Sequence, residues 1–167
     1  MAELGAAVQL QDGSLYHYFP NKHAIALACH QDALRVSIRC INNARNYEGT
    51  GWQKLRHMIV CFFVESAQQG PNIYAGDLSY LKEPDRSRIA ADRRRFIDQV
   101  AQFIQAGCSD GSVRVANAAI AAEAVCSILF WLPKWSHEHR LDHQTFGVTI
   151  IDAIASLLGA ETLSQLQ

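Results

Sequence analysis

The stretch GSLYHYFPNK, residues 13–22, decides how this sequence is interpreted. Four ring-bearing side chains, three of them tyrosine or phenylalanine and one histidine, occupy the consecutive positions 16–19. Pro20 is expected to end a short helix, because proline lacks the backbone N–H group that continues one. Asn21 is a favoured residue for capping the next helix. The stretch therefore predicts one short helix followed at once by another.

A further short helix is predicted directly before this stretch. Small and apolar residues at 4–10 favour a helix, and Gln11-Asp12 provides a tight connection. Two short helices with a close turn form a helix-turn-helix, whose second helix fits the major groove of DNA. Leu15 and Phe19 would then face inward. The side chains left to meet DNA are Ser14, Tyr16, His17 and Tyr18, while Lys22 and the start of the next helix offer a phosphate site. An aromatic packing cluster is the alternative.

Composition limits the classes of protein to which the chain can belong. With 167 residues, 49% hydrophobic and 19% charged, it is long enough for one compact domain or a small module fused to a larger one. A net charge of -1 provides no global basic field, so contact with nucleic acid must come from local placement. Five scattered cysteines without a CxxC pair are typical of reduced thiols in a cytoplasmic protein. We expect no signal peptide and no membrane contact, since the most apolar stretch, 118–132, is short and contains Glu123.

Apolar residues repeat three and four positions apart along most of the chain, which indicates amphipathic helices. Gly107 is expected to provide a left-handed cap for one of them, and Asp110-Gly111 a turn. No alternating strand pattern occurs, so the predicted fold class is all-α. The predicted helices span about 21–46, the stretch between Gly51 and Gly70, 89–107, 116–135, and a last segment from Phe146 to Gly159. A short helix or helical turn is predicted at about 73–81.

The stretch LGAAVQLQDGSLYHYFPNKHAIALA, residues 4–28, resembles the helix-turn-helix signature of the tetracycline-repressor (TetR) family of transcriptional regulators. The residues in register with that signature are Gly13, Leu15, Tyr16, Tyr18, Phe19 and Lys22. The resemblance implies a partial DNA-binding domain at 1–45, running into a connecting helix, and an antiparallel helical bundle for ligand binding and dimerisation at 46–167. It implies base contacts by Tyr16 and His17, phosphate contacts by Ser14, Tyr18 and Lys22, and a further DNA-binding candidate, Gln11, in the lead-in to the recognition helix.

The sequence departs from the family pattern in three respects. Gln9 stands where the family usually has a turn glycine, and Asp12 places a negative charge next to DNA. The family also has another helix ahead of this motif, which makes the helix-turn-helix incomplete here. Over residues 1–45, four basic and three acidic side chains leave a net charge of only +1. We expect either a fragment of a longer repressor, which we favour, or a natural short form with poor DNA binding.

Large apolar side chains on the central helices are candidates for an effector pocket, with Tyr74, Tyr80 and Glu123 available to orient a ligand. A well-packed core is the alternative explanation of the same residues. The resemblance implies a hydrophobic or aromatic small molecule as effector, and we expect no cofactor. The predicted ligand-binding residues are Phe62, Phe63, Tyr74, Leu78, Phe96, Val100, Phe103, Cys126, Phe130 and Trp131.

The last two long helices carry more apolar surface than a chain of this size can bury against itself, which predicts a homodimer. The resemblance implies a four-helix interface between the two copies. Pro133 should kink or end its helix. The predicted interface residues are Ala121, Val125, Leu129, Ile150, Ile154 and Leu157.

Two other clusters are interpreted as surface features. His137, Glu138, His139, Asp142 and His143 contain metal-ligand types, but their position after Trp135 favours a solvated connection over a metal site. Arg93-Arg94-Arg95 is interpreted as an outer helix face that pairs with Asp85, Asp92 and Asp98.

The sequence contains no Gly-rich phosphate loop, nucleophile elbow or convincing acid pair, so we do not expect an enzyme. The predicted function is a ligand-responsive repressor that binds double-stranded operator DNA as a homodimer. Ligand would move the helix beginning at Asn21 and change the separation of the two recognition helices. The alternative is a dimeric ligand sensor without effective DNA binding.

Overall fold

The computed structural model describes residues 18–69, 78–139 and 143–162. These ranges contain five α-helices and no strand, which confirms the predicted all-α class. The remaining residues, 1–17, 70–77, 140–142 and 163–167, lie outside the description. The helices are α3 (Lys22–Arg45), α4 (Gly51–Gln69), α5 (Asp85–Asp110), α6 (Ala118–His139) and α7 (His143–Leu157).

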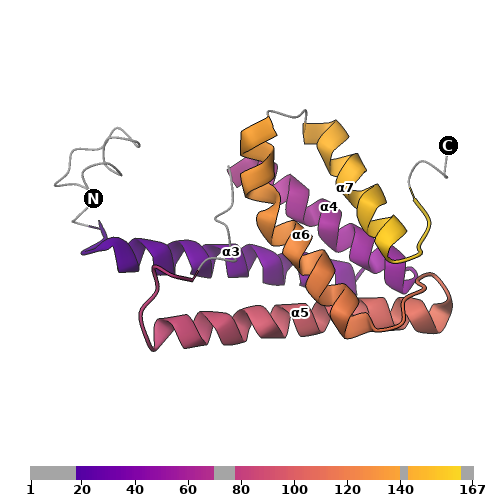
Figure 1. Ribbon diagram of the computed structural model, residues 1–167, viewed down its shortest axis with the longest axis horizontal. Helices are drawn as coiled ribbons and strands as arrows, with labels where there is room; N and C mark the ends of the chain where they lie inside the picture. The colour runs from indigo at the N-terminus through magenta and orange to yellow at the C-terminus, as the bar shows by residue number, and fades with distance from the viewer. Residues whose placement is uncertain (1–17, 70–77, 140–142, 163–167) are drawn as a thin grey trace.

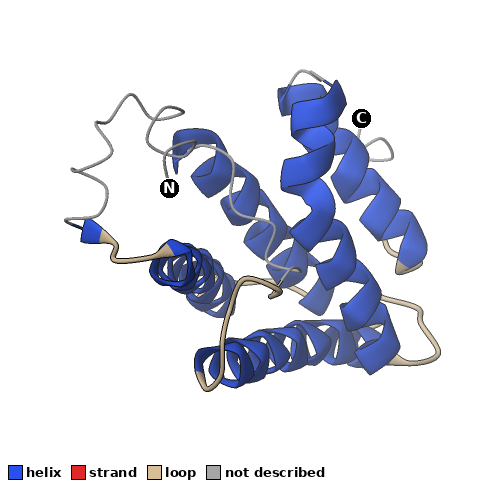
Figure 2. Cartoon of the chain, turned by 60° about the vertical axis from the view of Figure 1, so that its left-hand side comes forward, coloured by secondary structure: helices blue, strands red, loops and turns tan. Residues whose placement is uncertain are grey.

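The helices form two groups that share one core. α3 and α5 lie side by side along the base of the molecule, and α4 returns from the end of α3 (Figure 1). α6 and α7 rise from this base as an antiparallel pair, with α4 packed against α7 (Figures 1 and 2). Buried residues from all five helices form a single hydrophobic cluster, so the base and the rising pair fold as one unit.

The start of α3 agrees with the sequence prediction. Asn21 has an extended backbone, and its side-chain oxygen accepts a hydrogen bond from the N–H of Ala24 at 2.9 Å. This bond satisfies one of the N–H groups that the first turn of a helix leaves without an internal partner. The cap therefore fixes the point at which the chain turns into the connecting helix.

Gly107 does not end α5 as predicted, because the helix continues to Asp110 and Gly111 takes the left-handed cap at φ 81°. Gly107 instead allows a close helix crossing. A Cβ atom on Gly51 would lie 2.1 Å from the Gly107 nitrogen, and a Cβ on Gly107 would lie 2.5 Å from Cγ2 of Val113. The start of α4 can approach the backbone of α5 this closely because residue 51 is glycine, and the segment after α5 can pack against residue 107 because that residue is glycine as well.

One further boundary differs from the predictions. α6 continues through Pro133 to His139, so His137–His139 lies in the last turn of the helix and not in a connection after it. One proline removes a single backbone donor, which the surrounding turns of this 22-residue helix tolerate.

The described part of the short helix or helical turn predicted at 73–81, residues 78–81, is a turn. In it the N–H of Leu81 donates to the Leu78 carbonyl at 3.0 Å.

The cysteines and the apolar character of the helices also bear on the sequence predictions. All five cysteines are free thiols, and Cys40 and Cys126 are buried in the core. Within the described ranges, none of the helices combines the length and the apolar character that crossing a bilayer would require.

Candidate coupling site and regulatory core

The last described residues of the predicted DNA-binding motif lie at the start of α3. Tyr18 is 73% exposed, and Lys22 is exposed in the first turn of the helix. Both side chains are therefore accessible to a large partner. The other predicted DNA contacts, Gln11, Ser14, Tyr16 and His17, lie outside the described residues.

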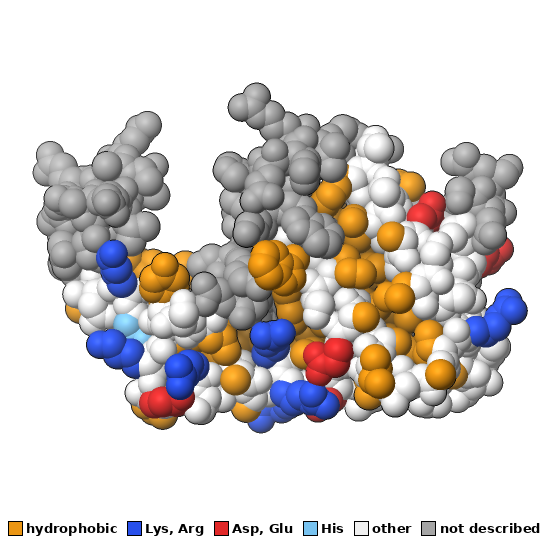
Figure 3. Space-filling model, viewed as in Figure 1, with side chains coloured by type: hydrophobic (Ala, Val, Ile, Leu, Met, Phe, Trp, Pro, Cys, Tyr) orange, Lys and Arg blue, Asp and Glu red, His pale blue; other side chains and the backbone are white. Residues whose placement is uncertain are grey.

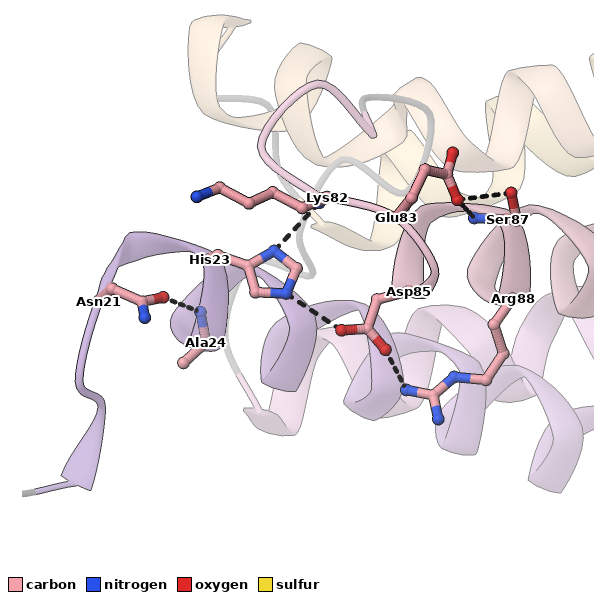
Figure 4. Close-up of polar contacts among 8 residues, drawn as sticks. All are labelled: Asn21, His23, Ala24, Lys82, Glu83, Asp85, Ser87 and Arg88. Atoms are coloured by element: carbon pink, nitrogen blue, oxygen red, sulfur yellow. Dashed lines mark hydrogen bonds and ion pairs between the residues drawn. The ribbon is translucent and has the colours of Figure 1, made fainter.

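His23 joins the first turn of α3 to the start of α5 (Figure 4). Its Nε2 atom lies 3.0 Å from Oδ2 of Asp85, and its Nδ1 atom accepts a hydrogen bond from the Lys82 N–H at 3.1 Å. The two residues that it contacts follow it by 62 and 59 positions in the sequence. We call His23, Lys82 and Asp85 the α3–α5 junction.

The two bonds determine which nitrogen of His23 carries a proton. Nδ1 accepts from a backbone N–H, so it cannot itself be protonated while that bond exists. The neutral ring with its proton on Nε2 then donates to the Asp85 carboxylate. Both ring nitrogens are used, which fixes the imidazole between the two helices.

A local network holds the other side of the junction. Asp85 begins α5, where a carboxylate interacts favourably with the positive end of the helix dipole. Its second oxygen accepts from Arg88 at 2.8 Å. Glu83 accepts from the hydroxyl of Ser87 at 2.6 Å and from the Ser87 N–H at 3.3 Å. The Ser87 hydroxyl is the main reason that the pKa of Glu83 lies below its usual value.

The opposite end of the base is fixed by a second set of bonds. The Gly51 N–H at the start of α4 donates to Asp110 at 2.7 Å, and the Trp52 N–H donates to the Ser112 hydroxyl at 3.1 Å. The Trp52 indole N–H donates to the Glu161 carbonyl at 3.0 Å. Hydrogen bonds from Ser112 and Gly51 lower the pKa of Asp110, the Ser112 hydroxyl contributing most. The beginning of α4, the end of α5 and the segment after α7 are therefore tied together.

Six of the ten predicted ligand-binding residues are buried in the core, on α4, α5 and α6. Phe96 and Phe130 have ring centroids 5.9 Å apart, and the Arg93 guanidinium lies 5.0 Å from the Phe130 centroid. Phe63 is partly buried with its ring edge against Phe146, Leu78 is half-buried and Trp131 is 38% exposed. Tyr74 lies outside the described residues. The members buried in the shared cluster are Phe62, Phe96, Val100, Phe103, Cys126 and Phe130.

Two of the three polar groups expected to orient a ligand are placed at the surface, and the third, Tyr74, lies outside the described residues. Tyr80 is exposed, and Glu123 pairs with Arg94 at 2.7 Å. The sequence analysis did not identify His30, which is a buried polar side chain on α3. Among the described residues, every buried side-chain nitrogen and oxygen has a hydrogen-bond partner.

The predicted dimer residues divide between the two sides of α6 and α7. Val125, Leu129 and Ile154 are fully buried within one chain, and Ala121 is nearly so, which corrects the expected interface. Ile150 is half-buried and Leu157 is exposed. Each step along a helix turns the side chain by about 100°, so the outward face of α6 lies one residue away from the predicted one. The positions that face outward on α6 are Ile120, Ala124, Ser127, Ile128 and Trp131.

The arginines of α5 form the outer charged face that the sequence predicted. Arg88 pairs with Asp85, Arg95 with Asp92, and Arg94 with both Asp98 and Glu123. Arg93 differs, because it lies over the Phe130 ring. No group of three or more metal-ligand side chains is found among the described residues, and the side chains of the His137–His143 cluster lie outside them.

A family model for the tetracyclin repressor-like C-terminal domain matches residues 48–155. This match covers α4, α5, α6 and most of α7. It therefore includes most of the hydrophobic core and the α5 side of the α3–α5 junction. The chain belongs to the TetR family. No curated protein matches the sequence of this TetR-family chain.

Solved structures share the fold of the chain over most of their length. A tetR-family regulatory protein from Rhodococcus RHA1 has a TM-score of 0.76 and 18% identity, with 95% of this chain and 85% of that chain covered. The TetR-family transcriptional regulator PfmR from Thermus thermophilus has a TM-score of 0.74 and 21% identity, with coverages of 95% and 87%. AibR in complex with isovaleryl coenzyme A and operator DNA has a TM-score of 0.71 and 17% identity, with coverages of 95% and 86%.

Sequence reasoning did not identify the α3–α5 junction. His23 follows the helix-turn-helix signature directly, but its partners at Lys82 and Asp85 are far away in the chain. Asp85 was assigned to the charged face with the arginines, which is only one of its two contacts. A histidine in the first turn of the connecting helix was the one available signal.

Proposed function

We propose that this TetR-family chain is a ligand-responsive transcriptional repressor that binds operator DNA as a homodimer and is released by a hydrophobic small molecule. The observation that carries the proposal is the α3–α5 junction. The helix that follows the DNA-binding signature is bonded through His23 to the first residue of α5, and α5 also contributes Phe96, Val100 and Phe103 to the core. A displacement of α5 by a ligand in the core would therefore be transmitted through His23 to the N-terminal end of α3.

The proposed effector site is the aromatic part of the core around Phe96, Phe103 and Phe130. These side chains belong to α5 and α6, so a ligand that separates them displaces α5. Arg93 lies beside Phe130 and provides a cation for an acidic group on an otherwise apolar ligand. AibR, which has the same fold, was solved with an acyl coenzyme A and operator DNA, and this supports a protein with both kinds of partner.

The proposed dimer interface is the outward face of α6 together with α7. Hydrophobic side chains gather over these two helices in the space-filling view (Figure 3). Ile120 is 68% exposed at one end of this face, and Leu157 is exposed on α7. The spacing of 120, 124, 127, 128 and 131 places these residues on one stripe of the helix, as a helix-to-helix contact requires.

The mechanism that we propose is a shift of populations. The chain would have two arrangements of α5, and effector binding would favour the second of them. Because His23 is bonded to Asp85 and Lys82, the start of α3 would move together with α5. In a dimer, the two recognition helices would then no longer match half-sites about one DNA turn, roughly 34 Å, apart. The proposal includes no catalytic step.

The decisive experiment selects DNA from a random-sequence pool with the purified chain and measures affinity for the selected sequence at several salt concentrations. A version extended by the codons upstream of Met1 in the gene is tested in parallel. We expect sequence-specific binding by at least one version, with affinity falling steeply as salt rises. If neither version selects a sequence, the dimeric ligand sensor replaces the repressor as the explanation.

The role of the junction is tested in the version that binds DNA, with a small molecule from a hydrophobic library that changes its affinity. His23→Ala should leave ligand affinity intact while the ligand effect on DNA affinity falls by about fivefold or more. Gln31→Ala, an exposed change on the same helix, is the control. If the ligand changes the DNA affinity of His23→Ala as much as that of wild type, the α3–α5 junction does not transmit the ligand signal.

A further inference from the structure

α3 and α4 present two thiols to each other in the middle of their contact. The Cys40 side chain on α3 is fully buried, and that of Cys61 on α4 is half-buried against the same core. Burial raises the pKa of the Cys40 thiol, and the neighbouring Cys61 thiol raises it further. The Asn43 amide, one turn after Cys40 on α3, donates to the Cys61 sulfur at 3.6 Å. Cys61 therefore lies against the edge of α3 that carries both Cys40 and Asn43.

Neighbouring contacts hold the two helices in register at this pair. The Arg39 guanidinium, next to Cys40, donates to the Glu65 carboxylate at 2.7 Å, and Glu65 is one turn after Cys61 on α4. The asparagine contact and the ion pair thus lie on either side of the two sulfurs. A disulfide requires thiols that already face each other, because α-carbons far apart cannot be bridged without backbone movement.

We propose that Cys40 and Cys61 are a peroxide-oxidisable pair that forms a disulfide between α3 and α4. The thiolate of Cys61 attacks one oxygen of hydrogen peroxide, the O–O bond breaks, and a sulfenic acid and hydroxide form. The Cys40 sulfur then attacks the Cys61 sulfur, the S–O bond breaks, and the hydroxyl group leaves as water with the Cys40 proton. Two thiols lose two electrons, and one peroxide is reduced to two waters.

The different surroundings of the two sulfurs indicate which thiol reacts with peroxide and which one closes the disulfide. Cys61 is accessible from solvent, as the residue that meets the peroxide must be. Cys40 is sealed in the core, and burial raises the pKa of its thiol well above the usual value. It therefore remains a protonated thiol until the sulfenic acid forms beside it. This inference goes beyond the proposed function and does not depend on DNA or effector binding.

The test treats the reduced, purified chain with stepwise additions of hydrogen peroxide and digests it with trypsin without reductant. Cleavage after arginine and lysine places Cys40 in the peptide 40–45 and Cys61 in the peptide 57–82. We expect these peptides joined, with the loss of two hydrogens, and separated again by dithiothreitol. Closing this loop should also raise the melting temperature by about 5 °C.

Three variants make the result specific. Cys61→Ala should abolish the joined peptide, and Cys108→Ala, a matched change of another half-buried thiol, should retain it. In Cys40→Ala, the Cys61 sulfenic acid should persist and react with dimedone. The proposal is overturned if the wild-type Cys61 advances to sulfinic acid without the joined peptide, or if the only disulfide links two chains. The wild-type and Cys61→Ala digests decide the question even if Cys40→Ala fails to fold.

Discussion

A single half-buried imidazole connects the two parts of the molecule that a regulator must couple. His23 uses one ring nitrogen for the Lys82 backbone and the other for the Asp85 carboxylate. His23→Ala removes both contacts and leaves the Lys82 N–H without its partner. We expect a loss of about 1 kcal/mol in the free energy of unfolding, the typical net value of such hydrogen bonds. Chemical denaturation measures this, with Gln31→Ala as the control that should change stability by less than about 0.5 kcal/mol.

Hydrogen exchange distinguishes a lost junction from a general loss of stability. The amides of residues 78–83 should exchange faster in His23→Ala, while those at the distant Gly51 and Trp52 end should be unchanged at matched stability. Equal acceleration at both ends would contradict a local role for His23.

Asp110 gives a pH dependence whose sign follows from its environment. Its pKa is lowered in the folded chain by Ser112 and by the Gly51 N–H, so its contribution to stability is present above the unfolded pKa of about 3.9 and is lost as pH falls through the folded pKa. Asp110→Asn should therefore melt at a lower temperature than wild type at pH 7. This difference should shrink as the pH falls below about 4.

A set of melting curves from pH 7 to pH 2.5 tests this prediction. Asp32→Asn is the matched control, because Asp32 contacts only the exposed Arg35 in its own helix and such pairs contribute little. If the melting temperatures of Asp110→Asn and wild type differ by the same amount at every pH, the charge of the Asp110 carboxylate does not stabilise the contact between the start of α4 and the end of α5.

At the scale of helices, two glycines permit close packing at the end of α5, Gly51 against the backbone of α5 and Gly107 against the segment after it. A Cβ at Gly107 would lie 2.5 Å from Val113, closer than side-chain atoms pack, so Gly107→Ala must displace the segment after α5. We expect a loss of about 1–3 kcal/mol, typical of overpacking. Gly147→Ala in α7 is the matched control, because its new methyl group would meet only Phe63 at 4.0 Å. That change should be neutral or stabilise by up to about 1 kcal/mol, and thermal unfolding compares the two.

The helices illustrate what the sequence can and cannot predict. The periodic apolar pattern located α3, and Asn21 caps it as expected. The role of Gly107 was misassigned, because a glycine near a helix end satisfies the pattern of a cap as well as that of a close crossing. The two patterns are distinguished by Gly51, which lies next to Gly107 only in the folded chain. The predicted interface residues on α6 lie one residue away from its outward face for a similar reason, since nearly every position from 118 to 132 is apolar and periodicity alone does not fix the rotation of such a helix.

At the scale of the whole molecule, the exposed apolar face of α6 and α7 should control assembly. Ile120→Asp places a charge in the proposed interface, and near the first turn of α6 a carboxylate is otherwise compatible with the helix. Together with Leu157→Asp, we expect it to raise the dimer dissociation constant by at least about 100-fold. Analytical ultracentrifugation over a range of concentrations measures the change.

The control for this prediction is Val60→Asp, a change of another exposed apolar residue, on α4. It should leave the dissociation constant within about threefold of wild type. Dimers that persist in the α6–α7 double variant, or dissociate equally in Val60→Asp, would place the interface elsewhere.

The length of α3 makes a small change in its tilt significant at its N-terminal end. Its 24 residues extend about 36 Å at 1.5 Å per residue. A tilt of about 5° about the end near Asn46 therefore sweeps Asn21 through roughly 3 Å, about one base-pair rise along B-DNA. Under the proposed function, α3 would convert a movement of about the size of a side-chain rotation in the core into a displacement that matters for two DNA-binding ends in a dimer.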